Sequence, residues 1–265
     1  MKIFYKILLL SLITSCSPDK EAVQEEESTD KKENPSASGF NISGSDPRAI
    51  EIADSVVLAM GGRENYDNLR YLAWNFFGAR DLIWDKKTDR VRIDIPAQKT
   101  TYLVNVSTME GKAKVNDMEV TQPDSLQKHM QIAKEIWIND SYWLVMPFKL
   151  KDSGVTLKYA REDTLKSGLI MDVIELTFDG VGVTPENKYE VYVDRADRLV
   201  RQWAYFKDAS QSTPSAVWPW DNYMEYNGVF LSANRSDGKG PHNIRVYEDL
   251  ADATFESFRT PEFNF

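Results

Sequence analysis

Short strand-forming segments recur along the chain from residue 71 onward. Their signature is alternation of apolar and polar residues or enrichment in β-branched and aromatic ones, and Val91, Ile93 and Ile95 show it most plainly. The segments are 71–77, 91–95, 101–107, 155–159, 169–178, 188–193, 199–206, 223–232, 243–247 and 254–258. Turn residues separate them, including Gly111, Asn116-Asp117 and Asn227-Gly228. Short strands joined by turns predict an antiparallel sheet, and the fold is expected to be mainly β with added helices.

Two helices interrupt this pattern. Asp46 is a favoured N-cap and Pro47 suits the first helical position, and the apolar spacing that follows ends at Gly61-Gly62. A second helix is predicted over 121–139, where Thr121 and Asp124 have the spacing of a capping box. The next segment, residues 142–148, is apolar on all sides and is interrupted by a proline. These helices are expected to cover the sheet.

The N-terminus carries an export signal. A basic start at residues 1–6 precedes an aliphatic run at 7–13, which is too short to span a bilayer. The string Ile13-Thr14-Ser15-Cys16 resembles the bacterial lipobox, in which cleavage precedes a cysteine that then carries lipid. We therefore expect residues 1–15 to be a signal peptide and Cys16 to be lipidated. The alternative is an ordinary signal peptide followed by a free thiol.

Residues 16–46 are predicted to be a lipidated, acidic and disordered tether, because they contain almost nothing able to pack. Asp19 and Glu21 partly match an acidic tag for export to the cell surface, although Pro18 and Lys20 interrupt it. A merely solvated spacer explains the segment equally well. The folded domain is expected over residues 47–265.

Composition excludes several classes of protein. The formal net charge is −9, which disfavours nucleic acid as a partner. The single cysteine leaves no internal disulfide, and no segment beyond the signal reaches the roughly 18 apolar residues of a membrane span. Only two histidines exist, His129 and His242, so a histidine-rich metal site is excluded. We expect no metal, no cofactor and a monomeric chain.

Catalytic motifs are weak. Ser125 and Lys128 match a bare Ser-x-x-Lys nucleophile pattern, but no Lys-Thr-Gly supports it and a helix start explains the stretch. We expect a protein that is not an enzyme. A hydrolase built on carboxylates stays open, because sequence alone cannot place two acids in space.

Aromatic placement is the most informative feature of the folded part. We propose that rings and flexible methionines line an apolar cavity between sheet and helices, whereas packing of the same residues in an ordinary core is the alternative. The cavity candidates are Trp74, Trp84, Met130, Trp137, Trp143, Met146, Phe148 and Trp203. Trp218-Pro219-Trp220 is expected in a loop, where exposed rings could stack on sugars or instead close over a barrel rim.

From about Pro47 to Phe265 the chain resembles the periplasmic lipoprotein-carrier superfamily, the LolA, LolB and LppX-like proteins. The segments that carry the resemblance are the opening helix with Gly61-Gly62, then residues 142–150, 189–194 with 199–200, 221–229 and 258–263. Within that superfamily the chain looks most like a branch of exported lipoproteins of Gram-negative bacteria. The resemblance implies an unclosed antiparallel β-barrel, with helices plugging its concave face and an apolar cavity that holds acyl chains.

Together these observations predict a lipoprotein held at the outer membrane by the lipid on Cys16, facing the periplasm or the cell surface. It would bind acyl chains or another apolar ligand, in lipid or lipoprotein trafficking. The alternative is a surface module that binds glycan or protein through exposed aromatic rings.

Overall fold

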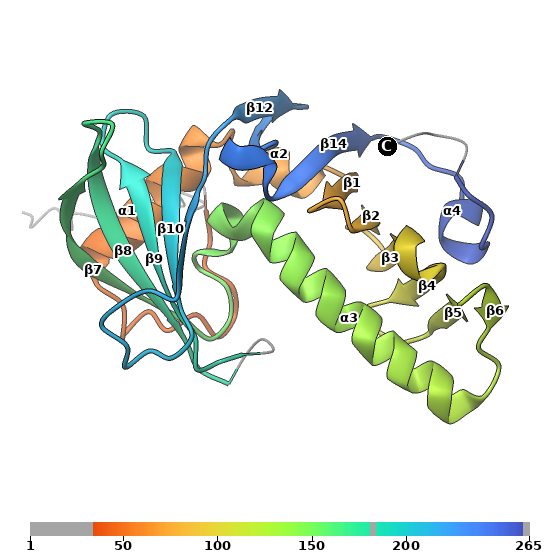
Figure 1. Ribbon diagram of the computed structural model, residues 1–265. Coiled ribbons are helices and arrows are strands. Elements are labelled where there is room, and N and C mark those ends of the chain that lie inside the picture. The colour runs from red at the N-terminus through yellow and green to blue at the C-terminus, as the bar shows by residue number, and fades with distance from the viewer. Residues whose placement is uncertain (1–33, 181–183, 262–265) are drawn as a thin grey trace, which may run out of the picture. The chain divides into compact units, whose positions relative to one another are not determined.

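The computed structural model describes residues 34–180 and 184–261, which form two antiparallel sheets, a hairpin and four α-helices (Figure 1). The seven-stranded sheet has the order β14-β1-β2-β3-β4-β5-β6. Its strands are β1 (Tyr71–Phe76), β2 (Arg80–Asp85), β3 (Arg90–Ile95), β4 (Thr100–Asn105), β5 (Gly111–Val115), β6 (Met118–Glu119) and β14 (Pro241–Tyr247). We call it the larger sheet.

The five-stranded sheet, called the smaller sheet below, has the order β11-β10-β9-β8-β7. Its strands are β7 (Val155–Thr164), β8 (Ile170–Phe178), β9 (Lys188–Asp194), β10 (Val200–Phe206) and β11 (Ala216–Pro219). The separate hairpin is β12 (Tyr223–Tyr226) with β13 (Val229–Ser232). Within the described residues neither sheet closes on itself, so the prediction of an open antiparallel fold with helices is confirmed.

The helices are α1 (Pro47–Ala59), α2 (Arg63–Asn68), α3 (Pro123–Val145) and α4 (Ala253–Glu256), with single 3-10 turns η1 (Pro96–Gln98), η2 (Met146–Lys149) and η3 (Ser236–Gly238). Among the described residues, no helix combines the length and apolar character that crossing a membrane requires.

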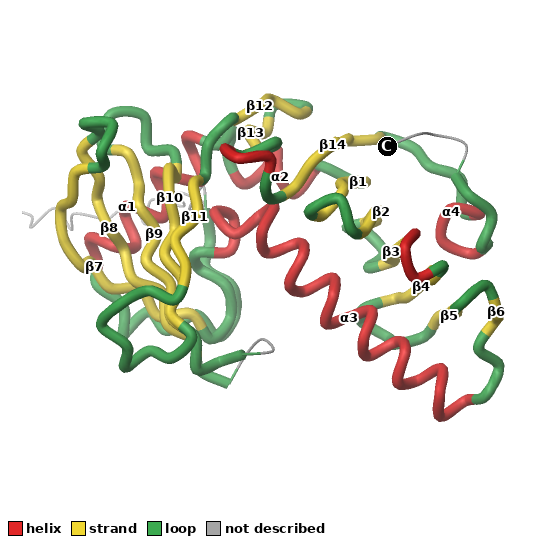
Figure 2. The backbone as a smooth tube through the Cα atoms, in the orientation of Figure 1, coloured by secondary structure: helices red, strands yellow, loops and turns green. Residues whose placement is uncertain are grey.

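Helix α3 packs on the larger sheet, where it contacts β3, β4 and β5 (Figure 2). Its buried positions include Met130, Ala133 and Leu144, whose spacings of three and then eleven residues (about three helical turns) keep them on one face of the helix. The predicted capping box is wrong, because the N-cap is Gln122 and no side chain caps the helix. The helix also continues to Val145, six residues beyond the predicted end.

An ion pair fixes α3 to β2. Arg80 donates from Nε and Nη2 to the two carboxylate oxygens of Asp140, at 2.7 and 2.9 Å. The Asp140 side chain is fully buried, and burial raises its pKa although the hydrogen bonds from Arg80 and Asn139 act in the opposite direction. The Arg80 guanidinium thus compensates a carboxylate that lies at a desolvated position.

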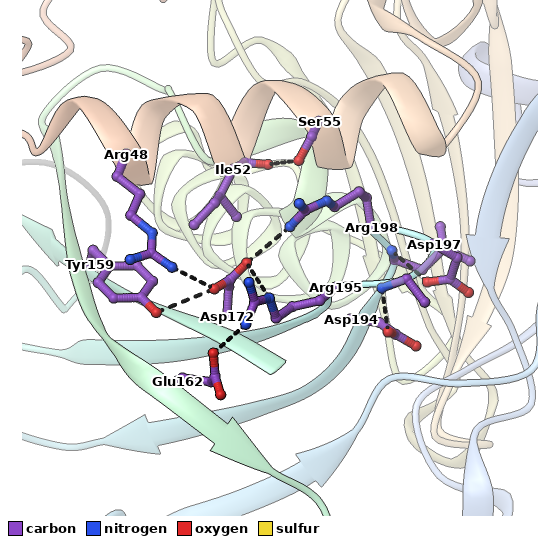
Figure 3. A network of polar contacts seen from close by, with 12 residues as sticks. Arg48, Ile52, Ser55, Tyr159, Glu162, Asp172, Asp194, Arg195, Asp197 and Arg198 are labelled. Atoms are coloured by element: carbon purple, nitrogen blue, oxygen red, sulfur yellow. Dashed lines mark hydrogen bonds and ion pairs between the residues drawn. The ribbon is translucent and has the colours of Figure 1, made fainter. Parts of the chain in front are cut away.

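Helix α1 packs against the smaller sheet, and a second buried carboxylate fixes it there (Figure 3). Asp172 of β8 is 4% exposed and accepts hydrogen bonds from Arg48 of α1 at 3.0 Å, Arg198 at 2.9 Å and the Tyr159 hydroxyl at 3.2 Å. Arg195 lies within 3.8 Å of the same carboxylate. The network thus joins the helix, two strands and the β9–β10 turn.

The chain before α1 packs too. Residues 34–46 lie along β7, with Asn41 N donating to Val155 O at 3.0 Å and Asp46 N donating to Leu157 O at 2.9 Å. Phe40 is part of the main core. Asp46 occupies the predicted N-cap position of α1, but its carboxylate accepts from Tyr159 N and makes no capping hydrogen bond to the helix. Packed structure therefore reaches back to Asn34, well before Pro47, while Cys16 and the signal peptide lie outside the described residues.

Two further local predictions were wrong. Residues 254–258 contribute to α4 rather than forming a strand. Gly111 begins β5 instead of making a turn, and a Cβ there would lie 2.0 Å from the backbone oxygen of Leu103. The glycine is needed for close approach of two strands and not for a left-handed conformation.

We predict that Arg80→Ala lowers the free energy of unfolding by about 3–5 kcal/mol, because it leaves the Asp140 carboxylate buried without a cation. Urea unfolding at neutral pH measures the loss. It should shrink under mildly acidic conditions, because the raised pKa of Asp140 allows the carboxyl to become neutral.

The control is Asp140→Asn in the Arg80→Ala background, which removes the charge but keeps the shape. This double variant should be more stable than Arg80→Ala alone. Equal stability of the two would contradict an uncompensated charge as the cause.

Candidate functional site

The structure divides the eight cavity candidates into two groups. Five are at most 2% exposed and belong to the main hydrophobic core: Trp74, Met130, Met146, Phe148 and Trp203. The other three, Trp84, Trp137 and Trp143, are partly buried and pack against that core. Ordinary core packing therefore accounts for much of the aromatic content.

Two pairs of tryptophans join α3 to the two sheets. Trp137 of α3 meets Trp84 of β2 edge to face, with ring centroids 5.2 Å apart. At the end of the same helix Trp143 meets Trp203 of β10 in the same manner, at 4.7 Å. The helix thus contacts the larger sheet through one ring pair and the smaller sheet through the other.

The aromatic contacts continue into the smaller sheet. Tyr142 lies beside Phe178 of β8, Tyr189 of β9 and Trp203 of β10, with ring centroids 5.7–6.5 Å apart. Tyr189 stacks on Trp203 at 5.0 Å. These contacts hold the C-terminal turns of α3 against the three inner strands of the smaller sheet.

Residues 218 and 219 belong to strand β11 and not to the expected loop, and of the two alternatives for the rings, exposure does not hold for Trp220. That ring is fully buried beneath the Arg235 guanidinium, which lies 3.6 Å from its centroid. Burial lowers the pKa of Arg235 to about 9. Trp218 is on strand β11, partly exposed, and contacts Phe77 edge to face.

A pocket of about 230 Å³ lies where α3 meets the smaller sheet. Helix α3 provides four lining residues, the segment from η2 to β7 another four, and β8 one. They are Trp137, Ile138, Ser141, Tyr142, Lys149, Asp152, Ser153, Val155 and Phe178. Of the eight sequence candidates, Trp137 lines this pocket.

Helical periodicity contained a signal that the sequence analysis missed. Ile138, Ser141 and Tyr142 have i, i+3, i+4 spacing, so a helix continued past Asn139 places them on one face. The predicted end at residue 139 separated Tyr142 from that face. Val155 and Phe178 line the pocket only because their strands pack beside α3, and no pattern in the neighbouring sequence predicts this.

Two polar groups among the lining residues lack partners. The Tyr142 hydroxyl and the Trp137 indole nitrogen Nε1 are buried and make no hydrogen bond within the described structure. Burial raises the pKa of Tyr142 well above its ordinary value, so its hydroxyl keeps its proton. The two charged lining groups, Lys149 and Asp152, form an ion pair with each other.

Three larger hollows, of about 680, 420 and 340 Å³, lie elsewhere in the described structure. One of about 680 Å³ lies beside α1 and α2, where Arg63 bonds to Asn34 and to the backbone oxygen of Phe148. Another of about 420 Å³ is lined mainly by asparagine, histidine and glycine, with Phe77 at its side. No group of three or more His, Cys, Asp or Glu able to hold a metal ion occurs among the described residues.

No protein-family model matches this chain, and no curated protein matches it. Several solved structures match it. A DUF1329 family protein from Desulfovibrio piger is 14% identical over 79% of this chain and 97% of its own, with a TM-score of 0.45. An outer membrane lipoprotein-sorting protein domain from Vibrio parahaemolyticus is 10% identical over 78% and 96%, with a TM-score of 0.37.

A LolA superfamily protein from Nitrosomonas europaea is 12% identical over 78% of this chain and 96% of its own, with a TM-score of 0.38.

We predict opposite effects from removing two tyrosine hydroxyls. Tyr142→Phe removes a buried, unpartnered hydroxyl and should raise the free energy of unfolding of the ligand-free domain by up to about 1 kcal/mol. Tyr223→Phe removes the donor to Val200 O at 2.9 Å and should lower it by about 0.5–1.5 kcal/mol. Thermal or urea unfolding compares the two. A similar loss in both variants would show that the Tyr142 hydroxyl has a partner.

Proposed function

We propose that this protein is a lipid-anchored envelope protein that binds an apolar ligand, such as an acyl chain, in the pocket between α3 and the smaller sheet. The observation that carries the proposal is the pocket's apolar lining under the central helix, made by Trp137, Ile138, Tyr142, Val155 and Phe178. Removal of apolar surface from water supplies the binding free energy, at about 25 cal/mol per Å².

The pocket volume limits the ligand. At about 230 Å³ it lies below the roughly 300–1,000 Å³ of pockets that enclose drug-sized ligands. It suits one short chain or the end of a longer one rather than a whole two-chain lipid. The role is binding, and lipid or lipoprotein trafficking is the process in which such binding fits an anchored envelope protein.

The alternative of surface recognition through exposed aromatics now depends on Trp218 and Phe77, since Trp220 is buried. The variant Trp218→Ala distinguishes surface recognition from binding of an apolar ligand in the pocket. It should leave apolar-ligand binding unchanged, because Trp218 does not line the pocket.

A pocket-filling substitution tests the main proposal. Ile138→Trp should abolish displacement of an anilinonaphthalene dye by short-chain methyl esters, because the larger side chain occupies the pocket. The matched control is Ile132→Trp on the same helix, where the side chain is 42% exposed and outside the pocket. Equal binding by both variants and the unaltered protein would count against this site.

Chain length gives a second test. Within a series of methyl esters, each added methylene should strengthen binding about fourfold, since each contributes about 0.8 kcal/mol, until the chain fills the pocket. Isothermal titration across the series measures this. Affinity that does not depend on chain length would contradict apolar burial as the driving force.

Anchoring is tested separately from binding. Cys16→Ala should abolish incorporation of labelled palmitate when the full chain is expressed in a Gram-negative host, whereas Ser17→Ala should retain it. Equal labelling of the two variants would refute lipidation at Cys16.

A further inference from the structure

The hollow of about 420 Å³ shares no lining residue with the pocket beside α3. Three segments line it: the β1–β2 turn, the loop between β13 and β14, and the start of β14. Two glycines contribute, together with the side chains of Asn75, Phe77, Asn234, His242 and Asn243. No Asp, Glu, Lys or Arg belongs to the lining among the residues that the structure describes, although these types make up 28% of the chain. An ionic ligand would find no opposite charge there, and an apolar one would desolvate the amides, so a neutral polar ligand fits best.

Hydrogen bonds hold the polar lining in place. Asn75 donates to Asp81 at 2.7 Å and accepts from Gly78 N at 2.6 Å, so its amide is already used. His242 Nδ1 lies 3.0 Å from Asn234 Oδ1. Because that oxygen is an acceptor, Nδ1 donates to it, and Nε2 of the neutral imidazole is then an acceptor.

The lining offers both donors and acceptors to a ligand. Within the described residues, the amide of Asn243 and the Nδ2 of Asn234 make no hydrogen bond. Both side chains are exposed and His242 is half-buried, so a ligand in solution reaches them. A hydroxyl group donates and accepts at once, whereas an ester or a ketone can only accept. A ligand that carries several hydroxyls therefore matches this set.

Phe77 adds an apolar surface to the hollow at a cost in backbone strain. Its φ of 53° lies in the left-handed region, which bulky residues rarely adopt. The side chain is nevertheless 36% exposed, and its ring meets Trp218 of β11 edge to face at 6.2 Å. Strain of this kind is concentrated at functional sites, so it indicates a use for the exposed ring.

We propose that this hollow binds a neutral sugar unit of a glycan. The sugar hydroxyls exchange hydrogen bonds with Asn234, His242 and Asn243. The C–H groups on one face of a pyranose ring carry partial positive charge and lie against the exposed surface of Phe77, because the face of an aromatic ring is negative. The inference does not rest on the proposed function, since the two sites share no lining residue.

Isothermal titration of the full chain with a panel of hexasaccharides tests the site. The neutral probes are maltohexaose, cellohexaose, xylohexaose and mannohexaose, and the anionic probe is hexagalacturonate. At least one neutral probe should bind, and hexagalacturonate should bind more weakly than that probe. Binding of none of the neutral probes, or tighter binding of hexagalacturonate, would overturn the inference.

Two variants place the binding in this hollow. Asn243→Ala should weaken the bound neutral hexasaccharide about two- to tenfold for each hydrogen bond lost. The matched control is Asn116→Ala at the β5–β6 turn, because Asn116 is also exposed and left-handed, with a φ of 51° against 50° for Asn243, but lies outside the hollow. Equal affinity of these two variants would contradict the site.

Phe77→Asn tests the ring, because asparagine tolerates the left-handed backbone and lets the turn fold. It should weaken the same hexasaccharide at least as much as Asn243→Ala, with thermal unfolding as the check on folding. A folded Phe77→Asn variant with unaltered affinity would overturn the inference.

The pocket variant Ile138→Trp separates this site from the proposed function. It should bind the hexasaccharide as the unaltered protein does, whatever its effect on methyl esters. Loss of saccharide binding in a folded Ile138→Trp variant would overturn the placement in this hollow, whereas unchanged ester binding in that variant counts against the apolar pocket alone.

Discussion

Helix α3 packs against both sheets, and the arrangement of the domain depends on these two sets of contacts. Along most of its length it buries an apolar stripe on the larger sheet, and the Arg80–Asp140 ion pair fixes its position there. Its last turns carry Tyr142 and Trp143, which pack on rings of the smaller sheet. One helix packs against both sheets, and the pocket lies beside the part of α3 where its contacts change from the larger sheet to the smaller one.

The two buried carboxylates show how charge is used to fix helices in this fold. Asp140 has one bidentate arginine and holds α3, whereas Asp172 is surrounded by several arginines and holds α1 (Figure 3). Removing a partner from a buried pair costs much more than the pair contributes in net stability. Such contacts therefore specify where a helix sits more than they strengthen the fold.

The aromatic interior combines packing with unused hydrogen-bond donors. Five of the seven tryptophans have buried indole nitrogens without a partner: Trp74, Trp84, Trp137, Trp203 and Trp220. Trp137 also lines the pocket beside α3. A ligand that binds there in the folded state alone should raise the stability of the domain.

The sequence by itself determined the turns, helix starts and strands that follow from local backbone preference and from the alternation of apolar residues. Asn116-Asp117 and Asn227-Gly228 form the predicted turns, with φ values between 48° and 80°, because these residues tolerate left-handed backbone. Helix α1 begins at Pro47 as predicted. The alternation around Val91 and Ile93 likewise located β3, because one face of that strand must be buried.

Only the tertiary structure decided which aromatic side chains are structural and which border a pocket. Trp74 and Trp137 have the same side chain, yet one is enclosed in the core and the other lines the hollow beside α3. Likewise, packing against the smaller sheet extends α3 beyond residue 139, and stacking under Arg235 buries Trp220. Burial depends on contacts between residues distant in sequence, whereas periodicity reports only which face of a helix or strand is apolar.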